Sequence, residues 1–494
     1  MKIFKYISKA SLWLMAGALA MTGCTDSFDE VNTDPDRPSA EIVPSTNTLA
    51  YCERYATDNM FDEWFDLNES AGFAGQIAKW QYTDEGYYNF RSSVNNSSWN
   101  VSYYTISNLQ AIIDKEEEGS NMWAAATIFQ CLIYQIASDR WGNIPYSEAL
   151  KLQEDITKPA YDNQSSIYPD LLRKLRSAVQ ALGTQDDEIG AGDIIFGGDV
   201  EAWKKFGNSL RLRIAARIAN VDASDAKNTF EEVMGNPSAY PIIDSNDYNA
   251  FFIWNAEYPE PYADYYQTRP YEYGVSQLMV NTLKNSNDPR LPIYCRPTVN
   301  YLSGVEGAEE YAGYPNGLEA YANVSAYSAI GERFMSSSSL TGFSPWYRAA
   351  ESYFAIAYAA SKGWNVGMTQ QEAYETAVAL SLEENGVSSA DADAFLAGGG
   401  LYDGTQEQLF TQWWVSLFKN GQEAWSVYRM SGYPAGNVVA PDSYFPGHNT
   451  PPMCYGYPDN ERNLNEENCL PQAEKESDYF WGKQMWWDVR TGLK

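Results

Sequence analysis

Aromatic rings and hydrogen-bonding side chains alternate in two stretches of the sequence, residues 80–99 and 254–273. A sugar presents apolar C–H faces and a rim of hydroxyls, so a sugar site combines flat rings with amide, carboxylate and guanidinium groups. The residues predicted to contact such a ligand are Trp80, Tyr82, Tyr88, Arg91, Trp254, Tyr258, Tyr265, Tyr266 and Tyr273. Two alternatives stay open, because aromatic loops also fold back onto their own domain and the same side chains suit peptides.

The composition favours a binding surface of this kind over a nucleic-acid surface. The 37 Tyr and 16 Trp far exceed the 20 Phe, so most rings carry a polar handle, as at wet binding surfaces. Lys and Arg number 34 against 65 Asp and Glu, which gives a net charge of −31. Such a surface repels phosphate backbones and anionic lipid, so no nucleic-acid partner is expected.

The sequence gives little support for a catalytic or metal-binding motif. His448 is the only histidine, which excludes an HExxH metalloprotease helix and leaves any triad dependent on one loop residue. A glycoside hydrolase needs only two carboxylates at a suitable separation, so that alternative stays open. The segment Asp391-Ala392-Asp393 lacks the glycine of a calcium loop, so adventitious calcium is possible but no cofactor is predicted.

The first residues predict export and lipid attachment. Lys2, Lys5 and Lys9 precede an apolar run over 10–21, which is the layout of a secretory signal and is too short to span a bilayer. The sequence Met21-Thr22-Gly23-Cys24 resembles a bacterial lipobox, in which the cysteine is acylated and becomes the first mature residue. The acidic residues that follow resemble an export tag for the outer face of the cell. The alternative is a plain signal peptide with an incidental Cys24.

Helical periodicity covers most of the remaining chain and predicts an all-α scaffold. The clearest stripe, from Ala125 to Ile136, ends at the Gly and Pro of residues 139–146. Asp199 is the predicted N-cap of a helix to Asn220, and Thr369 with Glu372 has the spacing of a capping box. Further helices are expected over 59–80, 99–115, 165–182, 275–284, 346–361, 405–418 and 421–430, with a last one from about Gln472. The helix pairs have the length of tetratricopeptide-like hairpins.

Residues 236–345 interrupt this pattern with Pro, Gly, Asn, Ser and Tyr, which predicts a large irregular, functional loop region. Arg211, Arg213 and Arg217 stand out in so acidic a chain. They could bind an anionic ligand, but pairing with carboxylates of neighbouring helices is the favoured interpretation.

Several motifs in order along the chain resemble the SusD/RagB family of outer-membrane lipoproteins. They are Cys24 with its acidic followers, the Asn32 to Pro38 leader, Trp141-Gly142-Asn143-Ile144-Pro145-Tyr146-Ser147-Glu148-Ala149, Asn208-Ser209-Leu210-Arg211-Leu212-Arg213, Asp288-Pro289-Arg290-Leu291, Gly421-Gln422-Glu423-Ala424-Trp425, and Tyr457-Pro458 through Asn468. Each is weak alone, and the order across nearly the whole mature chain carries the resemblance.

The resemblance implies tetratricopeptide-like helical hairpins that carry a loop-rich ligand-binding region. It implies a non-enzymatic, lipid-anchored protein of the outer membrane that faces the cell exterior. Such a protein binds an oligosaccharide and delivers it to a SusC-like TonB-dependent transporter, and some members handle peptides instead. The expected organisation is a signal peptide over 1–23, a lipidated leader over 24–45 and a single domain over 46–494 with its irregular insertion at 236–345.

Overall fold

The computed structural model describes residues 43–88, 91–318, 323–437, 448, 450–473 and 481–493. The predicted signal peptide, the predicted acylation site Cys24 and the leader up to residue 42 lie outside the described residues. The chain divides into residues Met1–Pro44 and the larger unit Ser45–Lys494, and the fold below is that of the larger unit.

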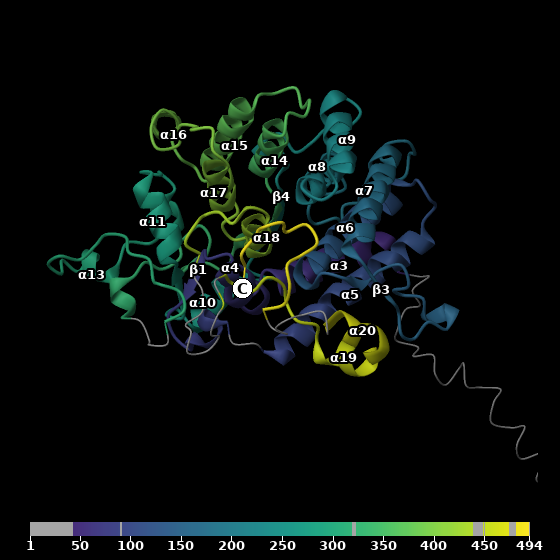
Figure 1. The fold of residues 1–494 in the computed structure, drawn as a ribbon, viewed down its shortest axis with the longest axis horizontal. Helices are drawn as coiled ribbons and strands as arrows, with labels where there is room; N and C mark the ends of the chain where they lie inside the picture. Colours follow the sequence, from purple (N-terminus) through teal and green to yellow (C-terminus); the bar gives the residue numbers. More distant parts are fainter. Residues whose placement is uncertain are drawn as a thin grey trace, which may run out of the picture. The chain divides into compact units, whose positions relative to one another are not determined.

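Successive helices form the first array of this unit, each from α5 to α8 packed against the next along the chain (Figure 1). Its members are α3 (Ser45–Met60), α5 (Ser92–Lys115), α6 (Asn121–Trp141), α7 (Gln164–Ala181), α8 (Val200–Ile218) and α9 (Ala223–Gly235). Helix α6 contacts α5, α7 and α8 together, so nearly all its residues are buried. The predicted apolar stripe therefore marks the central helix of the array.

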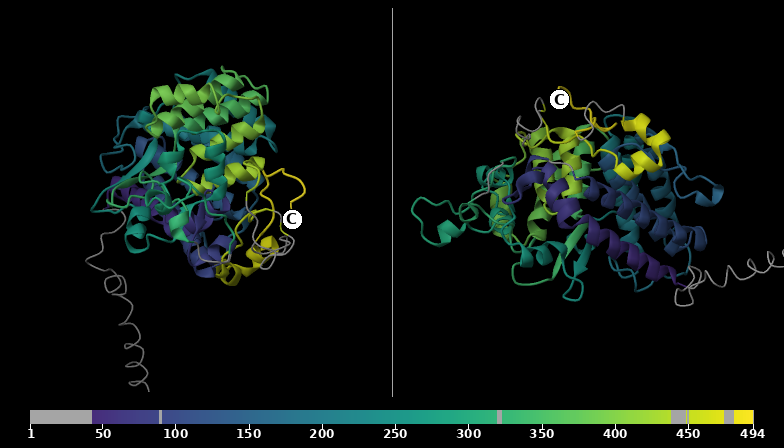
Figure 2. Two further views of the ribbon diagram at one scale, coloured as in Figure 1. Left: turned by 90° about the vertical axis from the view of Figure 1, so that its left-hand side faces the viewer. Right: turned by 90° about the horizontal axis from the view of Figure 1, so that it is seen from below.

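A second array continues the helical hairpins towards the C-terminus. It comprises α14 (Ala349–Ser361), α15 (Gln370–Glu384), α16 (Ser389–Leu396), α17 (Gln406–Ser416) and α18 (Gly421–Ser431). Helix α14 packs against both α8 and α17 and so joins the two arrays. Its many buried alanines permit this close approach on several sides. In the left view of Figure 2, α14 and α15 lie in green at one edge of the unit.

The described residues of the unit also form three two-stranded antiparallel sheets: β1 (Ile77–Lys79) with β5 (Tyr273–Val275), β2 (Ile144–Pro145) with β3 (Tyr161–Asp162), and β4 (Ala250–Trp254) with β6 (Gly342–Tyr347). The shorter elements are η1 (Glu63–Ser70), α4 (Ala71–Phe73), η2 (Thr83–Tyr87), η3 (Leu152–Glu154), η4 (Asn246–Tyr248), α10 (Pro261–Thr268), α11 (Gln277–Asn285), α12 (Leu291–Tyr294), α13 (Val299–Leu302), η5 (Val324–Ala326), α19 (Asp459–Leu464) and α20 (Glu466–Ala473). The predicted all-α class is confirmed, since helices dominate. Within the part of the chain that the structure describes, no helix has the length and apolarity needed to cross a membrane.

Capping residues were predicted correctly where their side chains satisfy local backbone groups. Asp199 accepts hydrogen bonds from the backbone N–H groups of Glu201 and Ala202 and begins α8. Thr369 and Glu372 form the reciprocal capping box of α15.

Three predicted helix bounds are wrong. The helix expected over 59–80 is instead the end of α3, the π-helical η1 and strand β1, while α5 begins at Ser92 and not at residue 99. Near the C-terminus, α19 and α20 occupy a segment expected to be a loop, and α20 already contains Gln472. Tertiary packing decides these short elements more than local periodicity does.

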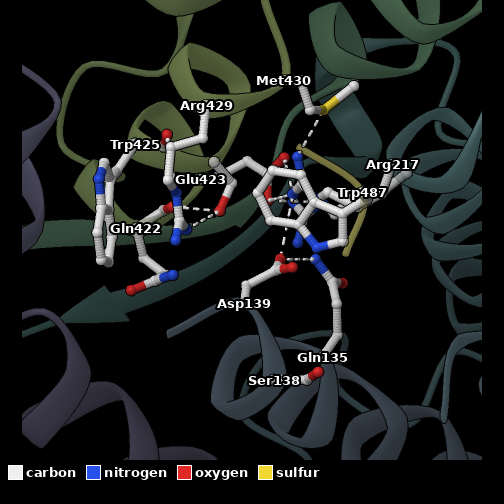
Figure 3. A network of polar contacts seen from close by, with 12 residues as sticks. Gln135, Ser138, Asp139, Arg217, Gln422, Glu423, Trp425, Arg429, Met430 and Trp487 are labelled. Atoms are coloured by element: carbon white, nitrogen blue, oxygen red, sulfur yellow. Dashed lines mark hydrogen bonds and ion pairs between the residues drawn. The ribbon is translucent and has the colours of Figure 1, made fainter. Parts of the chain in front are cut away.

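The arginines of α8 pair with carboxylates of other helices, as predicted. Arg213 pairs with Glu351 of α14, and Arg211 pairs with Glu232 of α9. Arg217 lies 3.2 Å from Asp139 of α6 and 2.6 Å from Glu423 of α18, and Figure 3 shows this network. Because the charges around Arg213 and Arg217 are buried, each one depends on its partners for solvation.

Candidate functional site

The pairing of β1 with β5 brings the two aromatic, polar stretches together. In this sheet Ile77 faces Val275 and Lys79 faces Tyr273. The Trp80 N–H extends the ladder by donating to the Glu272 carbonyl oxygen at 2.6 Å. Residues 80–88 therefore leave the sheet beside residues 261–272, although about 180 positions separate them in the sequence.

A pocket of about 800 Å³ opens where these segments meet the end of α3. Its lining residues are Asp58, Asn59, Asp62, Glu63 and Trp64 from α3, η1 and their junction, Lys79 from β1, Tyr82, Glu85 and Arg91 from the first stretch, and Pro259, Pro261, Asp264, Tyr265, Thr268, Arg269 and Glu272 from the second. This volume lies within the range of pockets that hold a small organic ligand.

Two groups of ion pairs hold polar side chains of the pocket lining in place. The buried Glu85 carboxylate accepts a hydrogen bond from Lys79 Nζ at 2.5 Å and pairs with Arg91. Arg269 Nη1 lies 2.9 Å from Glu272, whose carboxylate also accepts the Tyr265 hydroxyl. These contacts hold cationic and hydroxyl donors in place before a ligand arrives, which lowers the entropic cost of binding.

Three aromatic rings line the pocket together with these charged side chains. The Tyr82 side chain is 57% exposed and has a left-handed backbone, with φ at 50°. Trp64 is 37% exposed and lies beneath Arg91, whose guanidinium carbon is 5.6 Å from the ring centroid. Tyr265 is half-buried, and Arg269 lies 6.0 Å from both Tyr82 and Tyr265. A positive φ in a tyrosine is uncommon, and such backbone strain often accompanies function.

Burial raises the pKa of three carboxyl groups near the end of α3. It raises the pKa of Asp62 to about 8, although hydrogen bonds from the backbone N–H groups of Phe65 and Trp64 oppose the shift. Burial also raises the pKa of Asp58 and of Glu63. A protonated carboxyl can both donate to and accept from a sugar hydroxyl, so this wall can serve either end of such a hydrogen bond.

Three of the nine predicted ligand contacts, Tyr82, Arg91 and Tyr265, line this pocket. Four others, Trp80, Tyr88, Trp254 and Tyr273, are buried. Trp80 packs so closely on Gly274 that a Cβ there would lie 2.0 Å from the indole. A ring enclosed by its own protein has no face left for a sugar, so these four residues are not proposed as ligand contacts.

The remaining two predicted contacts lie outside the pocket lining. Tyr258 is exposed beside Arg54, whose guanidinium carbon is 5.6 Å from the ring centroid. Tyr266 is half-buried under Arg296 at 4.8 Å. Tyr266 also packs against the hydrophobic core, whereas the Tyr258 ring keeps much of its surface in solvent.

Trp64 and Asp58 line the pocket but were not predicted as ligand contacts from the sequence. Trp64 stands between acidic residues, Asp62 and Glu63 before it and Asp66 after it, which is the same mixture of ring and carboxylate that marked the other stretches. We expected a helix over 59–80, and an aromatic side chain in a long helix more often packs in the hydrophobic core than binds a ligand. Trp64 was therefore not predicted as a ligand contact. Among the described residues, no group of three or more His, Cys, Asp or Glu side chains could hold a metal ion.

Known proteins resemble this chain along most of its length. A family model of SusD-like proteins, described as "Starch-binding associating with outer membrane", matches residues 38–458. A solved structure described as a chitin-binding protein is 25% identical, with a TM-score of 0.76 over 90% of this chain and 100% of that chain. No curated protein matches the chain.

Two further solved structures show the same fold. A SusD homologue from Bacteroides uniformis is 22% identical, with a TM-score of 0.77 over 90% of this chain and 99% of that chain. A chitin-binding SusD homologue from Flavobacterium johnsoniae is 23% identical, with a TM-score of 0.75 over 90% and 99%. The predicted scaffold of helical hairpins is thereby confirmed.

Proposed function

The chain belongs to the SusD-like family, and from that premise we propose that it binds extracellular glycan in the pocket between Trp64, Tyr82 and Tyr265. The family is one of binding proteins, so no catalytic step is assigned to these residues. A sugar ring would stack on Tyr82 or Trp64 while its hydroxyls bond to Arg91, Arg269 and the neighbouring carboxylates.

One observation carries this proposal: two stretches chosen from the sequence for their rings and polar groups meet at a single pocket. The pocket supplies both halves of sugar recognition, exposed aromatic faces and fixed hydrogen-bonding groups. Two related structures that bear chitin-binding descriptions support polymeric sugar as the ligand class.

The proposal extends to where the protein acts. Acylation of Cys24 would anchor the chain to the outer membrane, and the acidic residues behind it would direct it to the cell exterior. Glycan captured there would pass to a SusC-like TonB-dependent transporter. Palmitate labelling of wild type and of Cys24→Ser tests the anchor, because the label should disappear only in the variant.

Titration of the purified protein with chitin oligosaccharides, malto-oligosaccharides and mixed peptides tests the ligand class, with isothermal titration calorimetry as the readout. We expect at least one oligosaccharide series to bind and Tyr82→Ala and Trp64→Ala each to weaken binding about tenfold. An aromatic contact worth about 1.4 kcal/mol accounts for that factor.

The matched control is Tyr301→Ala, which removes an exposed tyrosine from α13, outside the pocket lining. It should bind as wild type does. Peptide binding without sugar binding would contradict the glycan proposal in favour of the peptide alternative. Shortened oligosaccharides after incubation would contradict the assignment as a binding protein.

A further inference from the structure

Three tyrosines form an exposed cluster on the surface of α3 and α5. The rings of Tyr51 and Tyr55 stack at 5.5 Å between centroids with an interplanar angle of 11°. Tyr104 of α5 closes the cluster edge-on, 5.3 Å from Tyr55 and 6.2 Å from Tyr51. Tyr104 is 49% exposed and Tyr51 is 37% exposed, so the cluster offers ring faces to solvent.

The core does not require Tyr51 or Tyr104, whereas the half-buried Tyr55 packs against it. Helix α3 buries its opposite side, which includes Leu49, Cys52 and Ala56 with no exposed surface. Tyr51, Tyr55 and Asn59 recur every four residues and share the outward side of α3. In the right view of Figure 2, α3 crosses the surface in purple.

A second pocket, of about 420 Å³, adjoins the proposed glycan site. It shares Asn59, Asp62, Trp64 and Arg91 with the first pocket, so the two hollows adjoin. Its far end is lined by α5 as far as Val101. Tyr104 is one turn beyond Val101 on α5, and Tyr55 is one turn before Asn59 on α3.

We infer that this surface is one continuous track for a polymeric glycan, on which the chain leaves the Trp64–Tyr82–Tyr265 pocket, crosses the second pocket and stacks on Tyr51 and Tyr104. The inference rests on the proposed function and deepens it, since it assigns a long chain as the preferred substrate. Eight residues of α3 separate Asn59 from Tyr51, which corresponds to about 12 Å along the helix. A disaccharide in the first pocket does not reach the tyrosines, and an extended oligosaccharide does.

The chemistry of the track fits a neutral sugar chain. Serines 93, 97 and 98 line the second pocket with hydroxyls, next to the apolar Val94 and Val101. The tyrosine cluster then adds flat faces and hydroxyls that can donate or accept hydrogen bonds. This alternation of apolar and hydrogen-bonding surface repeats what the first pocket offers.

The test compares short and long probes on the intact protein. Disaccharides and octasaccharides of N-acetylglucosamine and of glucose are titrated into wild type, into Tyr51→Ala/Tyr104→Ala and into Tyr82→Ala. We expect the double variant to bind the octasaccharide about tenfold more weakly than wild type, which corresponds to about 1.4 kcal/mol, and to bind the disaccharide equally well. Tyr82→Ala should weaken binding of both lengths.

Retained disaccharide affinity also shows that the double variant is folded, as expected for alanines at exposed helical positions. Equal octasaccharide affinity of wild type and the double variant overturns the track and leaves the pocket proposal intact. Equal affinity of wild type for short and long probes does the same. Failure of wild type to bind either series overturns the proposed glycan function, and the track with it.

Discussion

Glu423 is a buried carboxylate of α18 that lies close to two arginines of α8. It lies 2.6 Å from Arg217 and 3.7 Å from Arg213. Those two guanidinium groups also pair with Asp139 and Glu351, so the ion pairs join three buried carboxylates to two cations, while the buried Arg429 acts on Asp139 without a direct ion pair. Burial raises the pKa of Glu423 to about 7, against the lowering effect of Arg217 and Arg213. Near neutral pH the Glu423 carboxyl is therefore about half protonated in the folded protein.

The variant Glu423→Gln should show this protonation through the pH dependence of stability. A glutamate that titrates near 4.5 when unfolded and near 7 when folded stabilises the protein fully below pH 4.5 and loses that contribution as pH rises to 7. Glutamine does not titrate, so the stability of wild type relative to the variant should fall by roughly 3 kcal/mol between pH 4.5 and pH 8. Urea unfolding of both proteins across this range measures the difference.

A network held by ionised pairs would give the opposite sign. The advantage of wild type over Glu423→Gln would then grow as pH rises. Arg173→Gln provides a background control, since it removes a mostly exposed ion pair with Asp170 and should change stability by less than about 1 kcal/mol at every pH.

At the scale of elements, Asp62 connects the backbone of η1 to the proposed glycan site. Its carboxylate caps this segment by accepting hydrogen bonds from the N–H groups of Trp64 at 2.9 Å and Phe65 at 2.6 Å. The cap therefore fixes the direction in which the Trp64 ring enters the pocket.

Asp62→Ala should lower the free energy of unfolding by about 1 kcal/mol, because two backbone N–H groups lose their acceptor. Glycan affinity should fall with it, as Trp64 loses its fixed orientation. Asp62→Asn keeps an acceptor at the N-cap and should retain most of both properties. Thermal unfolding and calorimetric titration measure the two effects, and equal losses in both variants would assign the effect to the carboxylate charge instead of the cap.

The same scale explains what the sequence could predict. The stripe of α6, the Asp199 cap and the Thr369–Glu372 box are local patterns, so their helices were predictable from neighbouring residues alone. The pairing of β1 with β5 was not predictable, since three-residue strands almost two hundred positions apart carry no local signal for each other. Trp80 illustrates the consequence, because its burial depends on Gly274 of the partner strand. The sequence thus predicted the two stretches that form the pocket, but not which of their rings face it.

The net charge of the whole molecule affects how tightly the pocket binds neutral and acidic glycans. The sequence carries a net charge of −31, and the pocket lining has six acidic side chains, those of Asp58, Asp62, Glu63, Glu85, Asp264 and Glu272. Because the pKa of Asp62 is raised to about 8, this group is mostly neutral at pH 7 and up to five carboxylates remain charged. Only three cationic side chains, those of Lys79, Arg91 and Arg269, stand against them. An acidic polysaccharide therefore meets repulsion both at long range and at the site.

We expect neutral oligosaccharides to bind more tightly than oligogalacturonides of the same length, and the two to differ in their response to salt. Salt screens charges over about 10 Å at 0.1 M, so raising the ionic strength should strengthen the binding of the acidic probe and leave the neutral one unchanged. Titrations of both probes at low and at physiological ionic strength measure this. Tighter binding of the acidic probe at low salt would instead assign recognition to Arg91 and Arg269, and Arg269→Gln would then abolish that preference while leaving neutral glycan binding largely in place.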